Sequence, residues 1–517
     1  MVRTLFNICL SAVCQHELSD DLALMPGECK QRLLEFFASH DQLSTTDCER
    51  LLSSRYFSCN LTQLSFFLCD DLTDDLLTAM TKNNKKLERI VLVECSKISD
   101  QGIRNATRGQ KHLQLLELRA IRQLTDAGLE EVKSPYLHTL DLSGCNKITS
   151  GGLRDILSFH PYIGFLFLNH CRALDDFALY YISHFLGDRL RTLELDFPSN
   201  MTDPATALAH LSEQCPNLRQ LSLARFFNEA DESPPSPTAP FKIDGSNLQD
   251  VDLYANFFTT LPTLPEGVTT LRLSVNGDEN SAELVESLAS KPHLRSINLQ
   301  LSIRESSIQA VDNANNLLSR ILRVLGDKIT ILQVSVPRLF DEALTLILKN
   351  TPNLTHLALD VIHLNTYILQ RYFAGGYTFN ASRLRSLKIC KMRITYRILF
   401  AIARGARNLV ELETSHMYSV DDRFVSLLGD NCHQLQTVNF NGCRYVSDKG
   451  LANLARRCPL REVRIRGTAC TDKSLYLLAQ FCPELEWISH ADFSGRPKFT
   501  DVALQCLRDS CISRVIC

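Results

Sequence analysis

The chain has 517 residues, of which 45% are hydrophobic and 22% are charged, and its formal net charge is −3. These values are ordinary for a globular protein with a large core, and so small a charge gives no reason to expect nucleic-acid or membrane binding. The 19 cysteines are odd in number and contain no Cys-x-x-Cys pair, so neither a metal site nor a redox motif is indicated. We therefore expect no cofactor, and a reducing compartment, the cytoplasm or the nucleus.

Residues 4–16, TLFNICLSAVCQH, predict an N-terminal helix, because Leu5, Cys9 and Val13 recur every four residues and share one narrow face. The same segment follows Arg3 and has some features of a signal peptide, and five Asn-x-Ser/Thr sequons would suit a secreted protein. However, Asn7 interrupts the apolar run and no small-residue cleavage site follows, so we do not expect secretion.

Two more helices are predicted before residue 57. Pro26 suits the first turn of the second helix, and Thr46 and Glu49 have the spacing of a capping box at the start of the third. The second helix has an apolar stripe that consists of Cys29, Leu33, Leu34 and Phe37. One interpretation of residues 1–57 is a helical cap over an open core that begins at residue 58, which any repeat array needs.

From residue 58 to 517 one phrase recurs about 17 times: Leu-x-x-Leu-x-Leu, a small residue or Cys, and an Ile/Leu-Thr/Ser-Asp step. Residues 137–153, LHTLDLSGCNKITSGGL, are one example. The spacing of about 24 to 28 residues is typical of leucine-rich repeats. We therefore predict an α/β fold, a leucine-rich-repeat solenoid with parallel strands on the concave wall and helices on the convex wall. Such an array usually works as a binding surface, and we expect no catalytic residues.

Within each repeat the residue types predict positions. Alternating leucines such as Leu140 and Leu142 point into the core. The Cys near the strand end is expected to be a small buried hydrophobe rather than a reactive group, at Cys95, Cys145, Cys171 and Cys443. The Asp of the following step is predicted to cap a helix, at Asp74, Asp100, Asp126, Asp448, Asp472 and Asp501.

Three segments lengthen the repeats. Residues 226–247 are rich in Pro and acidic residues and predict an exposed loop, with possible phosphorylation sites at Ser233 and Ser236. Residues 306–326 predict a long helix, and residues 367–382 predict a protruding loop. Insertions of this kind often bind partners.

Counting along the last strands predicts which residues face outward from the concave wall. These are Ser386, Lys388, Glu411, Glu413, Thr437, Asn439, Glu462, Arg464, Arg466, Trp487 and Ser489. Trp487, the single Trp of the chain, would lie beside Arg464 and Arg466, a composition typical of interface hot spots, and we predict that protein substrate binds there. The alternative is that Trp487 packs against a C-terminal cap.

Two short segments resemble known docking motifs. Thr4, Leu5, Cys9 and Val13 match the BC box, the helix by which substrate receptors bind elongin C, which pairs with elongin B. Met25, Pro26, Cys29 and Leu33 resemble the cullin-2 box. Together with the repeats, the chain resembles the ZYG-eleven-type substrate receptors of cullin-2 ubiquitin ligases. The resemblance implies a non-catalytic receptor with elongin C, elongin B and cullin-2 as partners and an unidentified protein substrate.

The chain departs from that family, because it has leucine-rich repeats to its last residue and no armadillo repeats. Substrate would then be bound by the leucine-rich surface. Cys-Pro steps such as Cys458-Pro459 also resemble the repeats of F-box receptors, and residues 25–43 can be aligned with an F-box, although the Trp expected after its third helix is absent. A cullin-1 ligase receptor of the F-box type, a non-ligase scaffold and a secreted binding protein are the alternatives.

Overall fold

The computed structural model describes residues 22, 24–39, 43–227, 242–243, 245–256, 262–275, 281–301, 307–375, 378–489 and 498–511. The chain forms two compact units. Among the described residues, the N-terminal unit runs from Leu22 to Arg272 and includes Lys291–His293, and the C-terminal unit comprises Leu273–Ser290 and residues 294–511. The strand β9 (Thr270–Val275) contains the division between them.

In the described part of the N-terminal unit, three helices precede the first strand and the repeats follow. The helices are α2 (Gly27–Ser39), α3 (Thr46–Ser53), α4 (Arg55–Ser58), α5 (Asp74–Lys82), α6 (Asp100–Thr107), η2 (Asp126–Leu129), α7 (Ser150–Phe159), α8 (Phe177–Leu186), η3 (Gly187–Arg189) and α9 (Pro204–Gln214). The strands are β1 (Gln63–Phe67), β2 (Arg89–Val93), β3 (Leu115–Arg119), β4 (Thr139–Asp141), β5 (Phe165–Phe167), β6 (Thr192–Glu194), β7 (Gln220–Ser222) and β8 (Asp250–Leu253).

The C-terminal unit repeats the same plan. Its helices are α10 (Ser281–Ala289), α11 (Ile308–Leu325), α12 (Asp341–Asn350), α13 (Thr366–Ala374), α14 (Thr378–Ser382), α15 (Tyr396–Gly405), α16 (Asp422–Asn431), α17 (Asp448–Arg457), α18 (Asp472–Phe481) and α19 (Asp501–Ser510). Its strands are β10 (Ser296–Leu301), β11 (Ile331–Arg338), β12 (His356–His363), β13 (Ser386–Ile389), β14 (Glu411–Glu413), β15 (Thr437–Asn439), β16 (Glu462–Arg464) and β17 (Trp487–Ile488).

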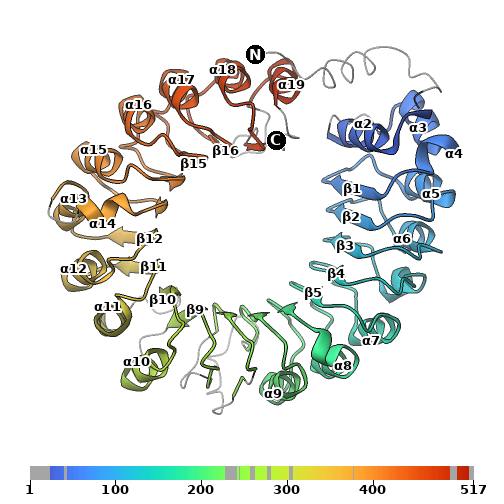
Figure 1. The fold of residues 1–517 in the computed structure, drawn as a ribbon, viewed down its shortest axis with the longest axis horizontal. Coiled ribbons are helices and arrows are strands. Elements are labelled where there is room, and N and C mark those ends of the chain that lie inside the picture. Colours follow the sequence, from blue (N-terminus) through green and yellow to red (C-terminus); the bar gives the residue numbers. More distant parts are fainter. Residues whose placement is uncertain are drawn as a thin grey trace. The chain divides into compact units, whose positions relative to one another are not determined.

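Within each unit the strands pair in parallel with their neighbours in the sequence. The helices lie on one side of the strands, and the opposite side of the strands is called the inner face below (Figure 1). Because side chains alternate along a strand, every second residue points between strands and helices and forms the core. Leu116, Leu140 and Leu166 occupy one register and are each fully buried. The predicted leucine-rich-repeat fold is confirmed.

The cysteines at the strand ends are buried, as predicted. Cys145 and Cys171 have no exposed surface, and the Cys145 thiol donates a hydrogen bond of 2.9 Å to the carbonyl oxygen of Leu118. Burial raises the pKa of both thiols to about 12, so the reactive thiolate is not formed at neutral pH. All the cysteines in the part of the chain that the structure describes are free thiols.

The predicted role of the repeated Asp residues is wrong. Each of the six Asp residues is the first residue of its helix, and the cap is the Ser or Thr before it, such as Ser99 before Asp100. The carboxylate instead reaches the next repeat: Asp100 accepts hydrogen bonds from the backbone N–H of Thr125 at 2.7 Å and from its hydroxyl at 2.6 Å. The Asp therefore joins one helix start to the next, an interaction that a single repeat considered alone does not reveal.

This contact recurs in both units and forms what we call the carboxylate ladder. Asp126 binds Thr149 in the N-terminal unit, and Asp448 binds Thr471 in the C-terminal unit, each through the backbone N–H and the hydroxyl. The other rungs are Asp74 to Ser99, Asp422 to Ser447 and Asp472 to Thr500. Hydrogen bonds to a charged acceptor are stronger than neutral ones, so the ladder contributes to the stacking of repeats.

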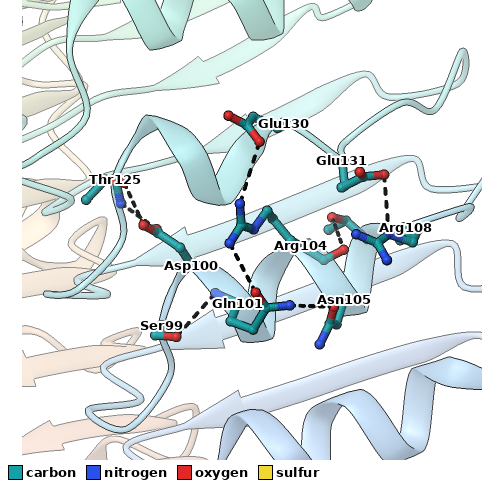
Figure 2. A network of polar contacts seen from close by, with 10 residues as sticks. Ser99, Asp100, Gln101, Arg104, Asn105, Arg108, Thr125, Glu130 and Glu131 are labelled. Atoms are coloured by element: carbon teal, nitrogen blue, oxygen red, sulfur yellow. Dashed lines mark hydrogen bonds and ion pairs between the residues drawn. The ribbon is translucent and has the colours of Figure 1, made fainter.

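Ion pairs and side-chain hydrogen bonds accompany the ladder on the outer side (Figure 2). From α6, Arg104 donates to Gln101 at 3.1 Å and lies 3.7 Å from the carboxylate of Glu130 in the next repeat. Arg108 lies 3.6 Å from Glu131. These groups are largely exposed, so each pair contributes less than about 1 kcal/mol, and the ladder beneath them is the stronger link.

A column of left-handed backbone conformations follows the strands. Ala120 has a φ of 54° and His170 a φ of 58°, a region that costs L-residues about 1 kcal/mol. Each of these residues donates its backbone N–H across the repeats: Ala120 to Ser143 at 2.8 Å and His170 to Asp196 at 2.7 Å. Non-glycine residues occupy most of the column, so residue type alone does not reveal these conformations.

The lengthened repeats are only partly as predicted. The long helix is confirmed as α11. The protruding loop predicted at residues 367–382 is wrong, because α13 and α14 occupy most of that segment and Tyr372 and Phe373 are buried. The aromatic residues belong to the core rather than to a surface loop. Most of the predicted loop at 226–247 lies outside the described residues. Among the residues the structure describes, no helix is long and apolar enough to span a membrane.

Candidate functional site

The helix α2 covers the first repeat of the N-terminal unit. Leu33, Leu34 and Phe37 are at most 1% exposed and pack inward, toward β1. A Cβ atom on Gly27 would lie 2.7 Å from the carbonyl oxygen of Asn60, so the start of α2 approaches the chain before β1 more closely than a side chain permits. These contacts fit the interpretation of α2 as a cap.

The residues of the predicted cullin-2 box are divided between surface and core. Pro26 is exposed, Met25 and Cys29 are half-buried, and Leu33 is fully buried within the chain. The first three are available to a partner and Leu33 belongs to the core of this unit. Cullin binding by this segment stays a prediction. The BC-box residues Thr4, Leu5, Cys9 and Val13 lie outside the described residues, so that motif also stays a prediction.

A buried lysine ties these helices together. Lys30 of α2 is 1% exposed, and its ammonium group donates a hydrogen bond to the carbonyl oxygen of Tyr56 and lies 5.9 Å from the centre of the Phe57 ring in α4. Burial lowers the pKa of Lys30. Lys30 thus fixes α2 against α4. The capping box predicted for α3 is absent, because the helix starts at Thr46 after Thr45 without a side-chain capping bond.

In the C-terminal unit the structure brings two of the three predicted substrate-binding residues together. Trp487 of β17 is half-buried, and the guanidinium of Arg464 on β16 lies 5.1 Å from the centre of its ring. Arg464 also donates to the carboxylate of Glu462, with 2.8 Å between Nε and Oε1. Arg466 follows β16, and its backbone N–H donates to Asn441 at 2.7 Å. Substrate binding here stays a prediction.

Three small polar residues predicted on the exposed wall are instead buried. Ser386, Asn439 and Ser489 are each at most 6% exposed. Ser386 donates to Glu411 at 2.6 Å, and Ser489 accepts from the backbone N–H of Ile465 at 2.8 Å. The alternation of side chains was assigned correctly, but short side chains are covered by the longer ones beside them.

The inner face of the N-terminal unit carries a charged row that we did not predict. One register position on seven successive strands forms the N-terminal inner row: Val91, Glu117, Asp141, Phe167, Glu194, Ser222 and Asp252. Four of these seven residues are carboxylates, and Arg272 on β9 lies 3.0 Å from Asp252, the last of them. The acidic residues stand at a fixed position in each repeat, but their alignment in one row follows only from the register of the paired strands.

The charges of this row are only partly balanced. Arg119 lies 3.4 Å from Glu117 and 3.7 Å from Asp141. Burial, and then the neighbouring charge of Asp141, raise the pKa of Glu117. Burial also raises the pKa of Asp141 and of Glu194, the latter with a contribution from the nearby charge of Asp196. Neighbouring negative charges therefore add to the effect of burial at Glu117 and Glu194.

The corresponding C-terminal inner row is different. It consists of Asn298, Gln333, Ala358, Lys388, Glu413, Asn439 and Arg464. Lys388 lies 2.8 Å from Glu411 and 4.0 Å from Glu413, so its charges are paired within the chain. Within the described residues, no group of His, Cys, Asp and Glu has the arrangement of a metal site.

No protein-family profile matches the chain. Over 147 residues it is 26% identical to F-box/LRR-repeat protein 4 of Bos taurus, a match that covers 28% of this chain and 23% of that protein. The matched part is thus about a quarter of the length of this curated relative.

Among solved structures, the chain is similar to one in a complex of Rad7 and Elc1 in yeast, with 16% identity, a TM-score of 0.41 and coverage of 97% of this chain and 96% of that one. It is also similar to an internalin of Listeria monocytogenes, with 16% identity, a TM-score of 0.33 and coverage of 76% and 90%. The chain is a leucine-rich-repeat protein that is similar, over part of its length, to an F-box/LRR-repeat protein.

Proposed function

We propose that this chain is the substrate-recognition subunit of a cullin-2 RING ubiquitin ligase and has no catalytic activity of its own. The helix predicted at residues 4–16 docks on elongin C, paired with elongin B, and the repeat surface binds the protein substrate. This assembly works in the cytoplasm or the nucleus. The observation that carries the proposal is the spacing of Leu5, Cys9 and Val13, followed by Met25-Pro26 and then a repeat array.

Two features of the described residues support this proposal. Met25, Pro26 and Cys29 have exposed surface at the start of α2, so the second motif is open to a partner. The remaining apolar face of α2 is occupied by the chain's own first repeat, as the burial of Leu34 and Phe37 indicates. An adaptor that needed this whole face, as expected for an F-box, would have to displace it.

The similarity to an F-box/LRR-repeat protein favours a second candidate, a receptor of a cullin-1 ligase. The match covers 147 residues, fewer than a third of the chain. In this alternative α2, α3 and α4 would together form the adaptor-binding element.

Co-purification distinguishes the two candidates. The full chain is co-expressed with elongins B and C, or with the adaptor that F-box proteins bind. Leu5→Ala with Cys9→Phe is expected to reduce elongin capture at least about thirtyfold, because it removes one buried anchor and overpacks another. Leu10→Ala is the control, since Leu10 is a similar side chain away from the Leu5–Cys9 stripe. Wild-type elongin yield from the double variant contradicts the elongin proposal, and capture by the F-box adaptor supports the alternative.

The second motif and the substrate surface have separate tests. Pro26→Ala should keep elongin binding and weaken cullin-2 binding, with Leu24→Ala as an exposed neighbouring control. Trp487→Ala with Arg464→Glu should abolish substrate turnover while elongin binding and the melting temperature are retained. Turnover that continues in this double variant would move the substrate site elsewhere.

A further inference from the structure

The inner face of the N-terminal unit combines exposed apolar side chains with unbalanced negative charge. Phe67 at the end of β1 is 40% exposed and Phe165 on β5 is 42% exposed. Val93 lies beside Phe67 in the register, and Phe167 follows two residues after Phe165 on the same face. Such side chains are costly to leave in water, and when grouped they commonly mark a protein-binding surface.

The register interleaves the aromatic and acidic groups. Phe167 lies directly between Asp141 on β4 and Glu194 on β6. Adjacent strands are about 4.8 Å apart, so an acidic residue stands on the neighbouring strand on each side of Phe167. Asp141 is 13% exposed and Glu194 is half-buried, which strengthens their electrostatic interaction with an incoming charge.

We propose that this inner face binds a polypeptide segment in which Lys or Arg alternates with apolar side chains. The apolar residues would contact Phe165 and Phe167, and the cations would lie against Glu117, Asp141 and Glu194. Charge complementarity favours this occupant: the four carboxylates of the N-terminal inner row are accompanied by two arginines, Arg119 and Arg272, so the surface keeps a net negative charge that a cationic partner would offset.

The size of the surface also fits such a segment. From β3 to β8 there are five inter-strand intervals of about 4.8 Å, which an extended peptide of about seven or eight residues would span. The C-terminal inner row cannot serve equally, because Lys388 and Arg464 stand on it and pair with neighbouring carboxylates. The inference goes beyond the ligase proposal, since binding to the isolated full chain does not depend on elongin or cullin.

The test uses fluorescence anisotropy with the full chain and three labelled peptides. The first peptide alternates Lys and Leu, the second replaces each Lys by Glu, and the third replaces each Leu by Ser. The first should bind, and the other two should bind at least about tenfold more weakly, because each loses one half of the complementarity. Equal binding of the Lys-Ser peptide would overturn the proposal, since charge alone would then explain it.

Variants locate the binding surface. Asp141→Asn with Glu194→Gln, and separately Phe167→Ser, should each weaken binding of the Lys-Leu peptide about tenfold or more. The matched control, Glu413→Gln with Glu462→Gln, removes the same charge from the inner face of the C-terminal unit and should change affinity less than about twofold. Circular dichroism confirms that each variant is folded. An equal loss in the control, or no binding by the wild-type chain, overturns the proposal, and neither result bears on elongin capture.

Discussion

The two units share one backbone plan and differ in the charged residues of their inner faces. The N-terminal inner row has four carboxylates, with Arg119 and Arg272 paired beside it, whereas the C-terminal inner row has two cations and one carboxylate. Burial raises the pKa of Glu194 in the first. In the C-terminal unit, burial acts in the same direction on Glu411, which lies beside the row, but hydrogen bonds from Lys388 and Ser386 outweigh it and lower its pKa.

This difference distinguishes the contacts that stack the repeats from the surfaces that are free to vary for binding. The carboxylate ladder and the leucine core are common to both units, so they belong to the architecture. The inner rows vary because side chains there do not determine the stacking. The unit that leaves its charge unbalanced is the better candidate for an electrostatic partner.

The largest expected effect concerns the shared ladder. A Cβ atom on Gly152 would lie 2.1 Å from the carboxylate oxygen of Asp126, so Gly152→Ala should destabilise the N-terminal unit by about 2–3 kcal/mol. The neighbouring Gly151 meets only Thr149, at 3.4 Å, and Gly151→Ala should be neutral or stabilising by up to about 1 kcal/mol. Urea unfolding measures both. Equal effects of the two substitutions would show that the ladder does not constrain this position.

A smaller loss is expected when a rung is removed in either unit. Asp126→Ala leaves the backbone N–H and hydroxyl of Thr149 without their acceptor, and Asp448→Ala does the same for Thr471. Each should cost about 1–2 kcal/mol in urea unfolding. Asp155→Ala, which removes an exposed helix carboxylate, should cost less than about 0.5 kcal/mol. A large cost in only one unit would contradict a shared role.

Neutralising one glutamate in each unit should change the free energy of unfolding in opposite directions. Glu194→Gln removes a carboxylate whose charged form the fold disfavours, so it should raise stability at pH 7. Glu411→Gln removes the partner of Lys388 and should lower it. Both changes should be below about 1 kcal/mol, because both sites are partly solvated. Unfolding curves for the two variants that shift in the same direction would remove the electrostatic distinction between the units.

The pH dependence should differ between the units in the same sense. The folded-state pKa of Glu194 is raised, so Glu194 adds to the stability of the fold while its carboxyl group is protonated. This stabilisation is lost as the pH rises through the raised pKa. The pKa of Glu411 is lowered, so its contribution is present above the unfolded pKa and is lost as the pH falls through the folded pKa. Hydrogen exchange, corrected for intrinsic rates, should therefore show that β5–β7 gain protection relative to β13–β15 when the pH falls from 7 to 5. The reverse ranking contradicts this assignment.

The sequence by itself determined the repeat, its strands and its core. Period-two alternation places Leu140 and Leu142 inward wherever the strand forms, and the recurrence fixes the spacing of the units. The burial of Cys145 and Cys171 was predictable for the same reason. The docking motifs at residues 4–13 and 25–33 depend on residue spacing alone, and they remain predictions.

Only the tertiary structure decided contacts between repeats. Asp100 was predicted to cap its own helix, and it binds Thr125 because stacking brings the next helix start within reach. Ser386 was predicted to be exposed, and the longer Glu411 beside it covers it. The N-terminal inner row appears only when the strands are aligned. These features join residues about 25 positions apart, and local periodicity carries no information about which side chains meet at that separation.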